Sequence, residues 1–290
     1  MQKTLFAKCS VERKEEHRII TRIIEEDGVK YVEKTAVGKA ANAHVEKMLT
    51  YEAEAPYLTE GVRVVPCEKI EDGRIRFPYI EGQRLDKAID EAAKQKKWDV
   101  LWEKVRLLRD IIMNVKETET FERTPEFDYY FGDVVIPEEW GSMEQLIGYT
   151  AARNVNIDMV AANIILADGI YVLDYEWRFD FPLPLKWILF RSIMLNGTLT
   201  TLPAEQREKL LELVEISREE EYIFSRMEEA FQRKLSGVTL YDLYLELPDK
   251  HTIVREENYR VPVQQEPHRS ISYRAARKVK RMIVSSVKRD

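Results

Sequence analysis

Three polar residues surround a short apolar segment near the middle of the chain. They are Asp158, Asn163 and Asp174, within NVNIDMVAANIILADGIYVLDYEW, residues 154–177. The runs NIIL and IYVLDY are typical of two strands, and the Ala-Asp-Gly between them is typical of a turn. Because a hairpin brings its two ends together, we expect Asn163 and Asp174 to be neighbours. A carboxylate and a carboxamide supply the oxygen ligands that Mg²⁺ takes beside substrate phosphates. Asp158 is expected to face the same site as a base or an orienting group.

The N-terminal part must supply the other side of such a site, and its sequence predicts strands. LFAKCSVER, RIITRIIEE and VKYVEKTAV are rich in β-branched and apolar residues, and a Glu-Asp-Gly turn separates the last two. GKAANAHVEKMLTYEAEAPYL, from Gly38, predicts one helix. GVRVVPCEKI and RIRFPYIEG then return to strand character. Residues 1–80 are therefore expected to form a five-stranded antiparallel sheet with one helix.

The rest of the chain is mostly helical in pattern. LDKAIDEAAKQKK and WDVLWEKVRLLRDIIMNVKE predict two helices, and Trp98 and Trp102 lie on the apolar stripe of the second. LPLKWILFRSIML, AEQREKLLELVEIS and EEYIFSRMEEAFQRKL predict three more. Strands followed by helices indicate an α+β fold. We expect a helical part over residues 81–250 that contains the hairpin, and a C-terminal extension over residues 251–290.

The order Asp-x4-Asn, hairpin, Asp resembles the catalytic and metal-binding segments of the protein-kinase-like superfamily. Asn-Ile-Asp ends at Asp158 where that superfamily usually has His-Arg-Asp, and Asp-Tyr-Glu begins at Asp174 where it usually has Asp-Phe-Gly. The Asp-aromatic-Glu form is similar to aminoglycoside phosphotransferases and choline kinases. The resemblance implies a two-lobed fold, with a small antiparallel-sheet N-lobe and a larger helical C-lobe, that binds ATP and Mg²⁺. It implies Asn163 and Asp174 as metal ligands and Asp158 as the catalytic residue at the acceptor hydroxyl.

The same resemblance implies an upstream lysine and glutamate that position the nucleotide phosphates. Lys34 on the third strand is the candidate lysine, and Lys30, on the same face of that strand, is the alternative. Glu52 is the candidate glutamate that holds the lysine, with Glu46 as the alternative. The segment FPYIEG, residues 77–82, is expected to be the hinge whose backbone holds the adenine.

The acceptor implied by the resemblance is a hydroxyl of a small molecule or a glycan. Nothing in the sequence resembles the long activation segment of kinases that act on proteins. The run EWRFDFPLPLKWILFR, residues 176–191, looks like the kinase-like domains of bacterial surface-polysaccharide gene clusters. The resemblance therefore implies a phosphotransferase, with a role in surface-polysaccharide biosynthesis as the narrower hypothesis.

Two departures from the superfamily pattern favour an alternative. The loop VERKEEHR between the first two strands has no glycine, although kinase phosphate loops are glycine-rich so that backbone N–H groups approach the phosphates. Asn156 stands where the superfamily has histidine. The alternative is a catalytically inactive pseudokinase that serves as a nucleotide-binding or scaffold module. Nucleotidylyl transfer on the same fold is a third hypothesis.

The distribution of charge along the sequence limits the classes of partner that the protein is expected to bind. The formal net charge is −6, yet the segment from Arg269 to Asp290 holds eight Lys or Arg residues and one acid. An acidic body argues against nucleic acid as a partner, whereas the basic tail can form an amphipathic helix on an anionic membrane surface. Cys9 and Cys67 are expected to be reduced thiols. The charged start and the lack of a long apolar stretch predict a cytoplasmic protein. The basic tail adds peripheral contact at the inner membrane face as a further hypothesis.

Overall fold

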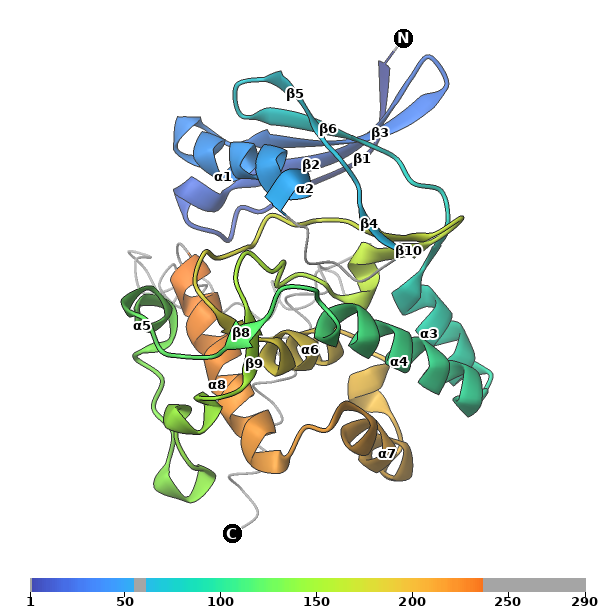
Figure 1. Ribbon diagram of the computed structural model, residues 1–290. Coiled ribbons are helices and arrows are strands. Elements are labelled where there is room, and N and C mark those ends of the chain that lie inside the picture. The colour runs from blue at the N-terminus through green and yellow to red at the C-terminus, as the bar shows by residue number, and fades with distance from the viewer. Residues whose placement is uncertain (1, 55–60, 237–290) are drawn as a thin grey trace, which may run out of the picture. The chain divides into compact units, whose positions relative to one another are not determined.

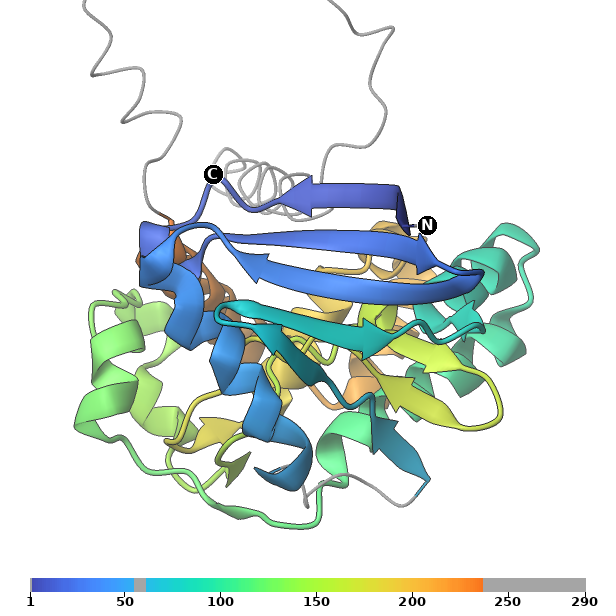
Figure 2. The same cartoon turned by 90° about the horizontal axis from the view of Figure 1, so that it is seen from above.

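The N-terminal part is a five-stranded antiparallel sheet in this computed structural model, which describes residues 2–54 and 61–236. The strands are β1 (Gln2–Cys9), β2 (Ile19–Glu26), β3 (Val29–Ala36), β5 (Glu68–Glu71) and β6 (Arg74–Pro78), in the order β1-β2-β3-β6-β5. Figure 2 shows these strands side by side, from dark blue β1 to teal β6. The expected five-stranded sheet is confirmed.

Strand β3 lies inside the sheet and presents a charged residue on each face. Adjacent residues of a strand point to opposite faces, and both Glu33 (1% exposed) and Lys34 (4% exposed) are buried. Glu33 accepts from Arg74 at 2.6 Å and from Arg76 at 2.8 Å, which lie beside it on β6. Although burial alone would raise the pKa of Glu33, the two guanidinium groups lower it. Glu33 is thus paired with arginines on one face of the sheet, and Lys34 lies on the opposite face.

The helix expected from Gly38 is instead a series of short turns. It comprises η2 (Lys39–Ala41), α1 (Asn42–Glu46), η3 (Lys47–Thr50) and α2 (Tyr51–Glu54). The buried residues Val45, Met48 and Tyr51 are spaced by three. A 3₁₀-helix has three residues per turn and keeps such a set on one face, whereas an α-helix turns it away. This spacing is compatible with the 3₁₀ turn η3 that lies between α1 and α2.

The run GVRVVPCEKI was predicted as one strand and forms two. β4 (Val62–Val64) pairs in parallel with β11 (Ile170–Val172), whereas β5 joins the five-stranded sheet. Pro66 lies between them and has no N–H for a sheet hydrogen bond. The chain consequently leaves one sheet and enters another at this residue.

Helices make up most of the remaining part, around a central helix α6 (Leu185–Met194) (Figure 1). Eight of its ten residues are buried. The others are α3 (Leu85–Lys94), α4 (Trp98–Met113), α5 (Pro125–Phe131), α7 (Ala204–Val214) and α8 (Arg218–Leu235). Trp102 of α4 is a core residue as expected, and Trp98 packs against the core while partly exposed. The α+β class is confirmed.

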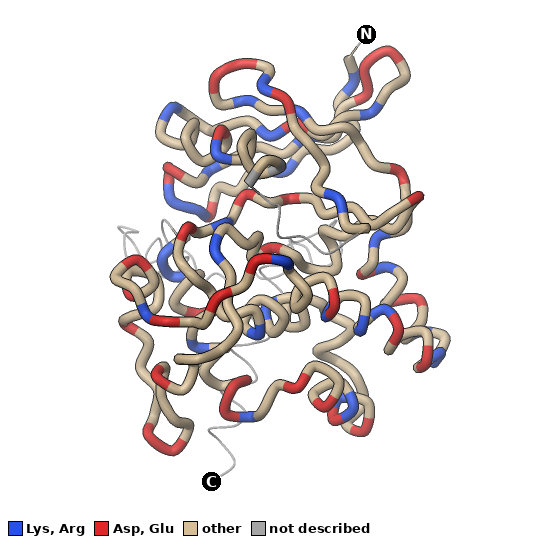
Figure 3. The backbone as a smooth tube through the Cα atoms, viewed as in Figure 1, with Lys and Arg blue, Asp and Glu red and all other residues tan. Residues whose placement is uncertain are grey.

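Short elements complete this part of the fold. A three-stranded sheet has the order β12 (Leu183–Pro184), β9 (Thr150–Ala152), β8 (Glu119–Thr120). Single 3₁₀ turns are η1 (Glu15–His17), η4 (Glu138–Trp140), η5 (Met143–Leu146), η6 (Ala161–Asn163) and η7 (Leu199–Thr201). Acidic and basic residues are interspersed along the described chain (Figure 3). Among the described residues, no helix is long and apolar enough to cross a membrane.

The domain boundaries near residues 80 and 250 stay predictions. Residues 1–237 form one compact unit. β7 (Gln83–Arg84), just after the expected hinge, pairs with β10 (Ile164–Leu166) of the hairpin. Gly82 passes so close to the hairpin that an added Cβ would lie 2.5 Å from the carbonyl oxygen of Leu166. The expected extension over residues 251–290, and its basic tail, lie outside the described residues.

Candidate active site at the hairpin

The hairpin forms where it was predicted and brings its two ends together. β10 and β11 pair antiparallel, and the turn closes with Ala167 N–H donating to Gly169 O at 2.9 Å. Beyond the strands, the N–H of Leu173 donates to the carbonyl oxygen of Asn163 at 2.8 Å. Asn163 therefore lies against the residue that precedes Asp174, as the hairpin argument requires.

Asp174 leaves the strand in a left-handed backbone conformation, with a φ of +56°. Only a few per cent of non-glycine residues adopt this conformation, and Asp is among the most tolerant. It forms an ion pair with the ammonium group of Lys34 on β3. The Lys34 side chain is 5% exposed and that of Asp174 is 39% exposed. The carboxylate thus meets the lysine from an open side of the site, where it remains accessible to a ligand.

Glu176 is the second carboxylate that holds Lys34, and it was noted in the sequence only as part of the Asp-Tyr-Glu form. Its Oε2 lies 3.1 Å from Lys34 Nζ, and its Oε1 lies 2.7 Å from Arg13 Nη2. Trp177 Nε1–H also donates to Oε1 at 3.0 Å. Burial would raise the pKa of Glu176, but Lys34, Arg13 and His44 lower it below its usual range. Burial would likewise lower the pKa of Lys34, and the two carboxylates raise it instead.

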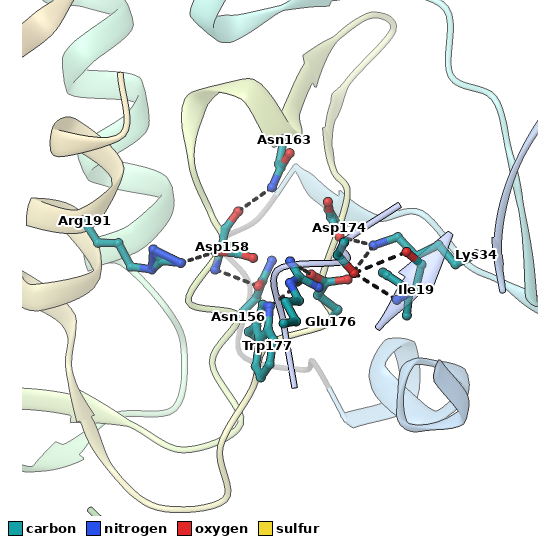
Figure 4. Close-up of polar contacts among 11 residues, drawn as sticks. Ile19, Lys34, Asn156, Asp158, Asn163, Asp174, Glu176, Trp177 and Arg191 are labelled. Atoms are coloured by element: carbon teal, nitrogen blue, oxygen red, sulfur yellow. Dashed lines mark hydrogen bonds and ion pairs between the residues drawn. The ribbon is translucent and has the colours of Figure 1, made fainter. Parts of the chain in front are cut away.

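Asp158 lies in a tightly bonded loop before the hairpin (Figure 4). Its N–H donates to Asn156 Oδ1 at 2.9 Å, and its carbonyl oxygen accepts from Asn163 Nδ2 at 3.0 Å. Arg191 of α6 reaches its carboxylate, with Nη2 2.8 Å from Oδ1. Burial raises the pKa of Asp158 to about 6, against the attraction of Arg191 and with the repulsion of Asp174 and Glu176. A carboxylate of that pKa is ionised at neutral pH and is basic enough to accept a proton.

Asn156 has a structural reason to replace histidine at this position. It is fully buried, and its amide oxygen fixes the backbone of Asp158. The loop then runs beside the segment that follows the hairpin, with Ile157 N–H donating to Trp177 O at 3.1 Å and Asn154 N–H to Phe179 O at 2.6 Å. A side chain that accepts from the backbone therefore supports Asp158 without an imidazole.

The structure separates the upstream candidates. Lys30 lies on the same face of β3 near its N-terminal end, where it forms an exposed pair with Glu81 at 2.9 Å, so Lys34 alone of the two contacts Asp174. Glu46 binds Lys69 at 2.9 Å and makes no described contact with Lys34. The side chain of Glu52 lies outside the described residues, and its role stays a prediction.

A pocket of about 640 Å³ adjoins this network on the side of α1 and α5. Its walls combine aromatic and charged residues, and part of them comes from the run 176–191. The aromatic lining consists of His17, His44, Tyr129, Tyr130, Trp177, Phe179 and Phe181. Glu176 lines the pocket and binds Lys34, so one carboxylate belongs both to the ion-pair network and to the pocket wall.

Comparison with known proteins places similar architectures among small-molecule kinases. No family model and no curated protein sequence matches the chain. The solved structures that are similar include choline kinase LicA from Streptococcus pneumoniae, 15% identical over 91% of this chain and 89% of that one, with a TM-score of 0.45. The gentamicin complex of APH(2")-IIa is 14% identical over 84% and 82%, with a TM-score of 0.43. Macrolide 2'-phosphotransferase MphH from Brachybacterium faecium is 13% identical over 92% and 94%, with a TM-score of 0.40.

All three are phosphotransferases of small molecules, which is the class that the sequence motifs resemble. At identities of 13–15% and TM-scores of 0.40–0.45, the likeness concerns the fold and not the reaction or the substrate.

Proposed function

We propose that this protein is a Mg²⁺-dependent phosphotransferase that moves the γ-phosphoryl group of ATP to a hydroxyl of a small molecule or a glycan. The observation that carries the proposal is the meeting of Lys34 with Asp174, residues 140 positions apart. Phosphoryl transfer needs positioned charge more than covalent chemistry. A buried ammonium, a half-open carboxylate and a basic carboxylate in one site supply such positioned charge.

The donor set fits a Mg²⁺ ion. Asp174 offers a partly exposed carboxylate. The side-chain amide N–H of Asn163 donates to the carbonyl oxygen of Asp158, so its amide oxygen is the atom that would bind the metal. Two protein oxygens, with the rest from water and phosphate, suit this ion. When bound, Mg²⁺ supplies positive charge that neutralises the phosphates during transfer.

Lys34 is assigned to the α- and β-phosphates. Its ammonium group is held between Asp174 and Glu176, so it is charged and immobile before any ligand arrives. Glu176 remains its partner when Asp174 turns to a metal ion. We propose that Glu176 fills the holding role that the superfamily pattern gave to Glu52.

Asp158 is assigned to the acceptor hydroxyl. One carboxylate oxygen is bound by Arg191, so the other is available to accept the proton. The acceptor oxygen then forms a bond to the γ-phosphorus as the bond to the β-phosphate oxygen breaks, ADP leaves, and Asp158 carries the proton. No covalent intermediate on the protein is needed.

The aromatic pocket is the place proposed for the acceptor. Its volume lies in the range of small-molecule sites. The lining includes the more exposed rings of Tyr129 and Tyr130 beside the run that resembles polysaccharide-cluster domains, and aromatic faces pack against the apolar faces of sugar rings. This supports a glycan among the acceptors to be tested, and with it a role in surface-polysaccharide biosynthesis.

Thermal shift and product analysis test the proposal. Wild-type protein should be stabilised by ATP with Mg²⁺ and much less by ATP with EDTA. Asp174→Ala should lose the metal-dependent part, whereas Asp168→Ala, in the exposed hairpin turn, should keep it. Asp158→Asn should bind ATP with Mg²⁺ and fail to transfer. The proposal is wrong if the wild type shows no metal-dependent shift, and pyrophosphate in place of ADP would identify nucleotidylyl transfer.

A second candidate, a pseudokinase that binds nucleotide without turnover, is favoured by one observation. Five backbone N–H groups of the loop between β1 and β2 are bonded within the protein, which leaves fewer of them to form a phosphate cradle. A metal-dependent shift without ADP release over a panel of sugars, amines and glycans would support this candidate.

A further inference from the structure

The loop between β1 and β2, residues 10–18, uses much of its backbone within the protein. Arg13 N–H donates to Ser10 O at 3.3 Å, His17 N–H to Lys14 O at 2.9 Å, and Arg18 N–H to Glu15 O at 3.3 Å. A donor that already has a partner is not free for an anion, and a loop without glycine resists the close approach of backbone to phosphate. With these N–H groups in use, a side chain of the loop is the stronger candidate for binding nucleotide phosphates on this side.

Arg13 is the side chain of this loop that reaches the site. Its Nη2 lies 2.7 Å from Glu176 Oε1, and its guanidinium carbon lies 5.4 Å from the centre of the Trp177 ring. Its Nη1 is buried and has no hydrogen-bond partner among the described residues. Leaving a donor of a charged group unpaired lowers the stability of the protein. An acceptor supplied by a ligand would satisfy this nitrogen.

The position of Arg13 is fixed from outside the loop. Lys14 N–H donates to Leu235 O at the end of α8 at 2.9 Å, and Arg13 forms an isolated β-bridge with Ser236. Arg18 Nε–H donates to the carbonyl oxygen of Arg13 at 2.7 Å. A long side chain on an anchored backbone is preorganised, which lowers the entropic cost of binding.

Charge counting supports an anion as the missing partner. Arg13 and Lys34 share Glu176, and Lys34 also meets Asp174, so these four side chains are balanced before Mg²⁺ is added. The field of Glu176, Asp158 and Asp174 raises the pKa of Arg13 against the effect of burial, so it is always charged. A Mg²⁺ ion would leave these four side chains two positive charges in excess, or one when Asp158 is counted with them, and polyphosphate is an anion that such an excess attracts.

We propose that Arg13 binds the phosphates of the nucleotide, taking the place of the backbone cradle that a glycine-rich loop provides. The inference rests on the proposed function, because it assumes that ATP binds at Lys34 and Asp174. The opposite reading of the same contacts is a latch, in which the Arg13–Glu176 pair closes the site against nucleotide. The two readings predict opposite changes in ATP affinity when Arg13 is replaced: weaker binding if Arg13 binds phosphate, and tighter binding if it is a latch.

Isothermal titration calorimetry with ATP, ADP and adenosine, each with Mg²⁺, measures this change in affinity. Arg13→Gln should weaken ATP and ADP by about 10- to 100-fold, the usual effect of one charge-assisted hydrogen bond. Adenosine, which has no phosphate, should bind equally to both proteins. Lys14→Gln is the matched control, because it removes the same charge one residue away and keeps the backbone contact with α8. Its affinity for ATP should change by no more than about twofold, because the Lys14 side chain has no described contact with Glu176, Lys34 or Asp174.

Other outcomes overturn the proposal. Tighter ATP binding by Arg13→Gln would establish the latch, and equal weakening of ATP and adenosine would establish a purely structural role. Arg13→Lys covers the case in which Arg13→Gln fails to fold, because it keeps the ion pair with Glu176 and loses the fork of donors. Full ATP affinity in Arg13→Lys, with wild-type unfolding temperature, would exclude a specific guanidinium contact. A wild type that binds no ATP would instead overturn the proposed function itself.

Discussion

Arg191 and Asp158 form an ion pair 2.8 Å long inside the protein, and Glu228 of α8 holds Arg191 from its other side at 3.2 Å. The guanidinium therefore fixes the direction of the Asp158 carboxylate and opposes the rise of its pKa. Arg191 lies in the last turn of the central helix α6, eight of whose ten residues are buried, so the candidate base is attached to a well-buried element of the fold.

Replacing Arg191 with Met should move the acid limb of the activity profile. Because Arg191 lowers the pKa of Asp158, its removal should raise that pKa above about 6. Activity should then be lost at a higher pH as the carboxylate takes up a proton. The measurement is kcat/KM from pH 5 to 8. Arg191→Lys keeps the charge and should leave the limb near its wild-type position, and an unmoved limb in Arg191→Met would contradict the role.

Lys34→Met should destabilise the protein strongly. Its ammonium group separates two carboxylates, one of them buried, and removal of one partner of a buried pair costs about 3–5 kcal/mol. Lys30→Met on the same strand removes an exposed pair with Glu81 and should leave the stability almost unchanged. Urea unfolding of both variants checks the difference, and similar midpoints would show that Lys34 is not held as described.

Glu33→Gln should separate stability from ligand binding. The carboxylate is 1% exposed and bonded to Arg74 and Arg76 on the face opposite Lys34. Its loss leaves two half-buried guanidinium groups short of a partner, which costs about 3 kcal/mol. The affinity for ATP should stay unchanged. Titration calorimetry and urea unfolding check the two parts, and a large loss of affinity would show that the two faces of β3 are coupled.

His44→Phe should flatten the acid side of the stability profile. Burial lowers the pKa of His44 from 6.5 to about 4, against the attraction of Glu176, and His17, Arg13 and Lys34 lower it further. The folded protein therefore keeps His44 neutral where the unfolded chain takes up a proton. This contribution is fully present above pH 6.5 and is lost as the pH falls toward 4, by roughly 2–3 kcal/mol.

Phe keeps a ring against His17 and Trp177, which lie 5.0 and 4.6 Å from the His44 ring. The unfolding free energy measured between pH 7 and 4.5 should fall less steeply in His44→Phe than in the wild type. Identical slopes would mean that His44 titrates normally in the folded protein.

The sequence predicted the parts of the site that follow from local patterns. Asp158, Asn163 and Asp174 became candidates because a hairpin is a local structure with a fixed geometry. Lys34 became one through the resemblance, and strand alternation left Lys30 beside it as an alternative on the same face. Arg13 and Arg191 were missed because nothing local marks them. Each lies in a charged loop or an apolar helix where a guanidinium has many uses, and only the packing of α6 and α8 decides what it touches.

The same limit applies to the fold. β1, β2 and β3 were predicted because their apolar runs and turn are contiguous. The division of residues 61–70 between two sheets was not, because β4 finds its partner at residues 170–172. The interruption of the helix after Gly38 was visible in principle, since Val45, Met48 and Tyr51 are spaced by three.

The pairing of β4 with β11 also bears on how the chain folds. Val62 and Ile170 are partners across more than a hundred residues, and parallel pairs of such separation form slowly because a long loop must close first. During synthesis the N-terminal sheet emerges well before β11 exists. Because Asp174 lies two residues beyond β11, we expect it to reach its final position only after this pair has formed. Substitutions at this pair of strands should then slow the recovery of ligand binding after dilution from denaturant more than they lower stability.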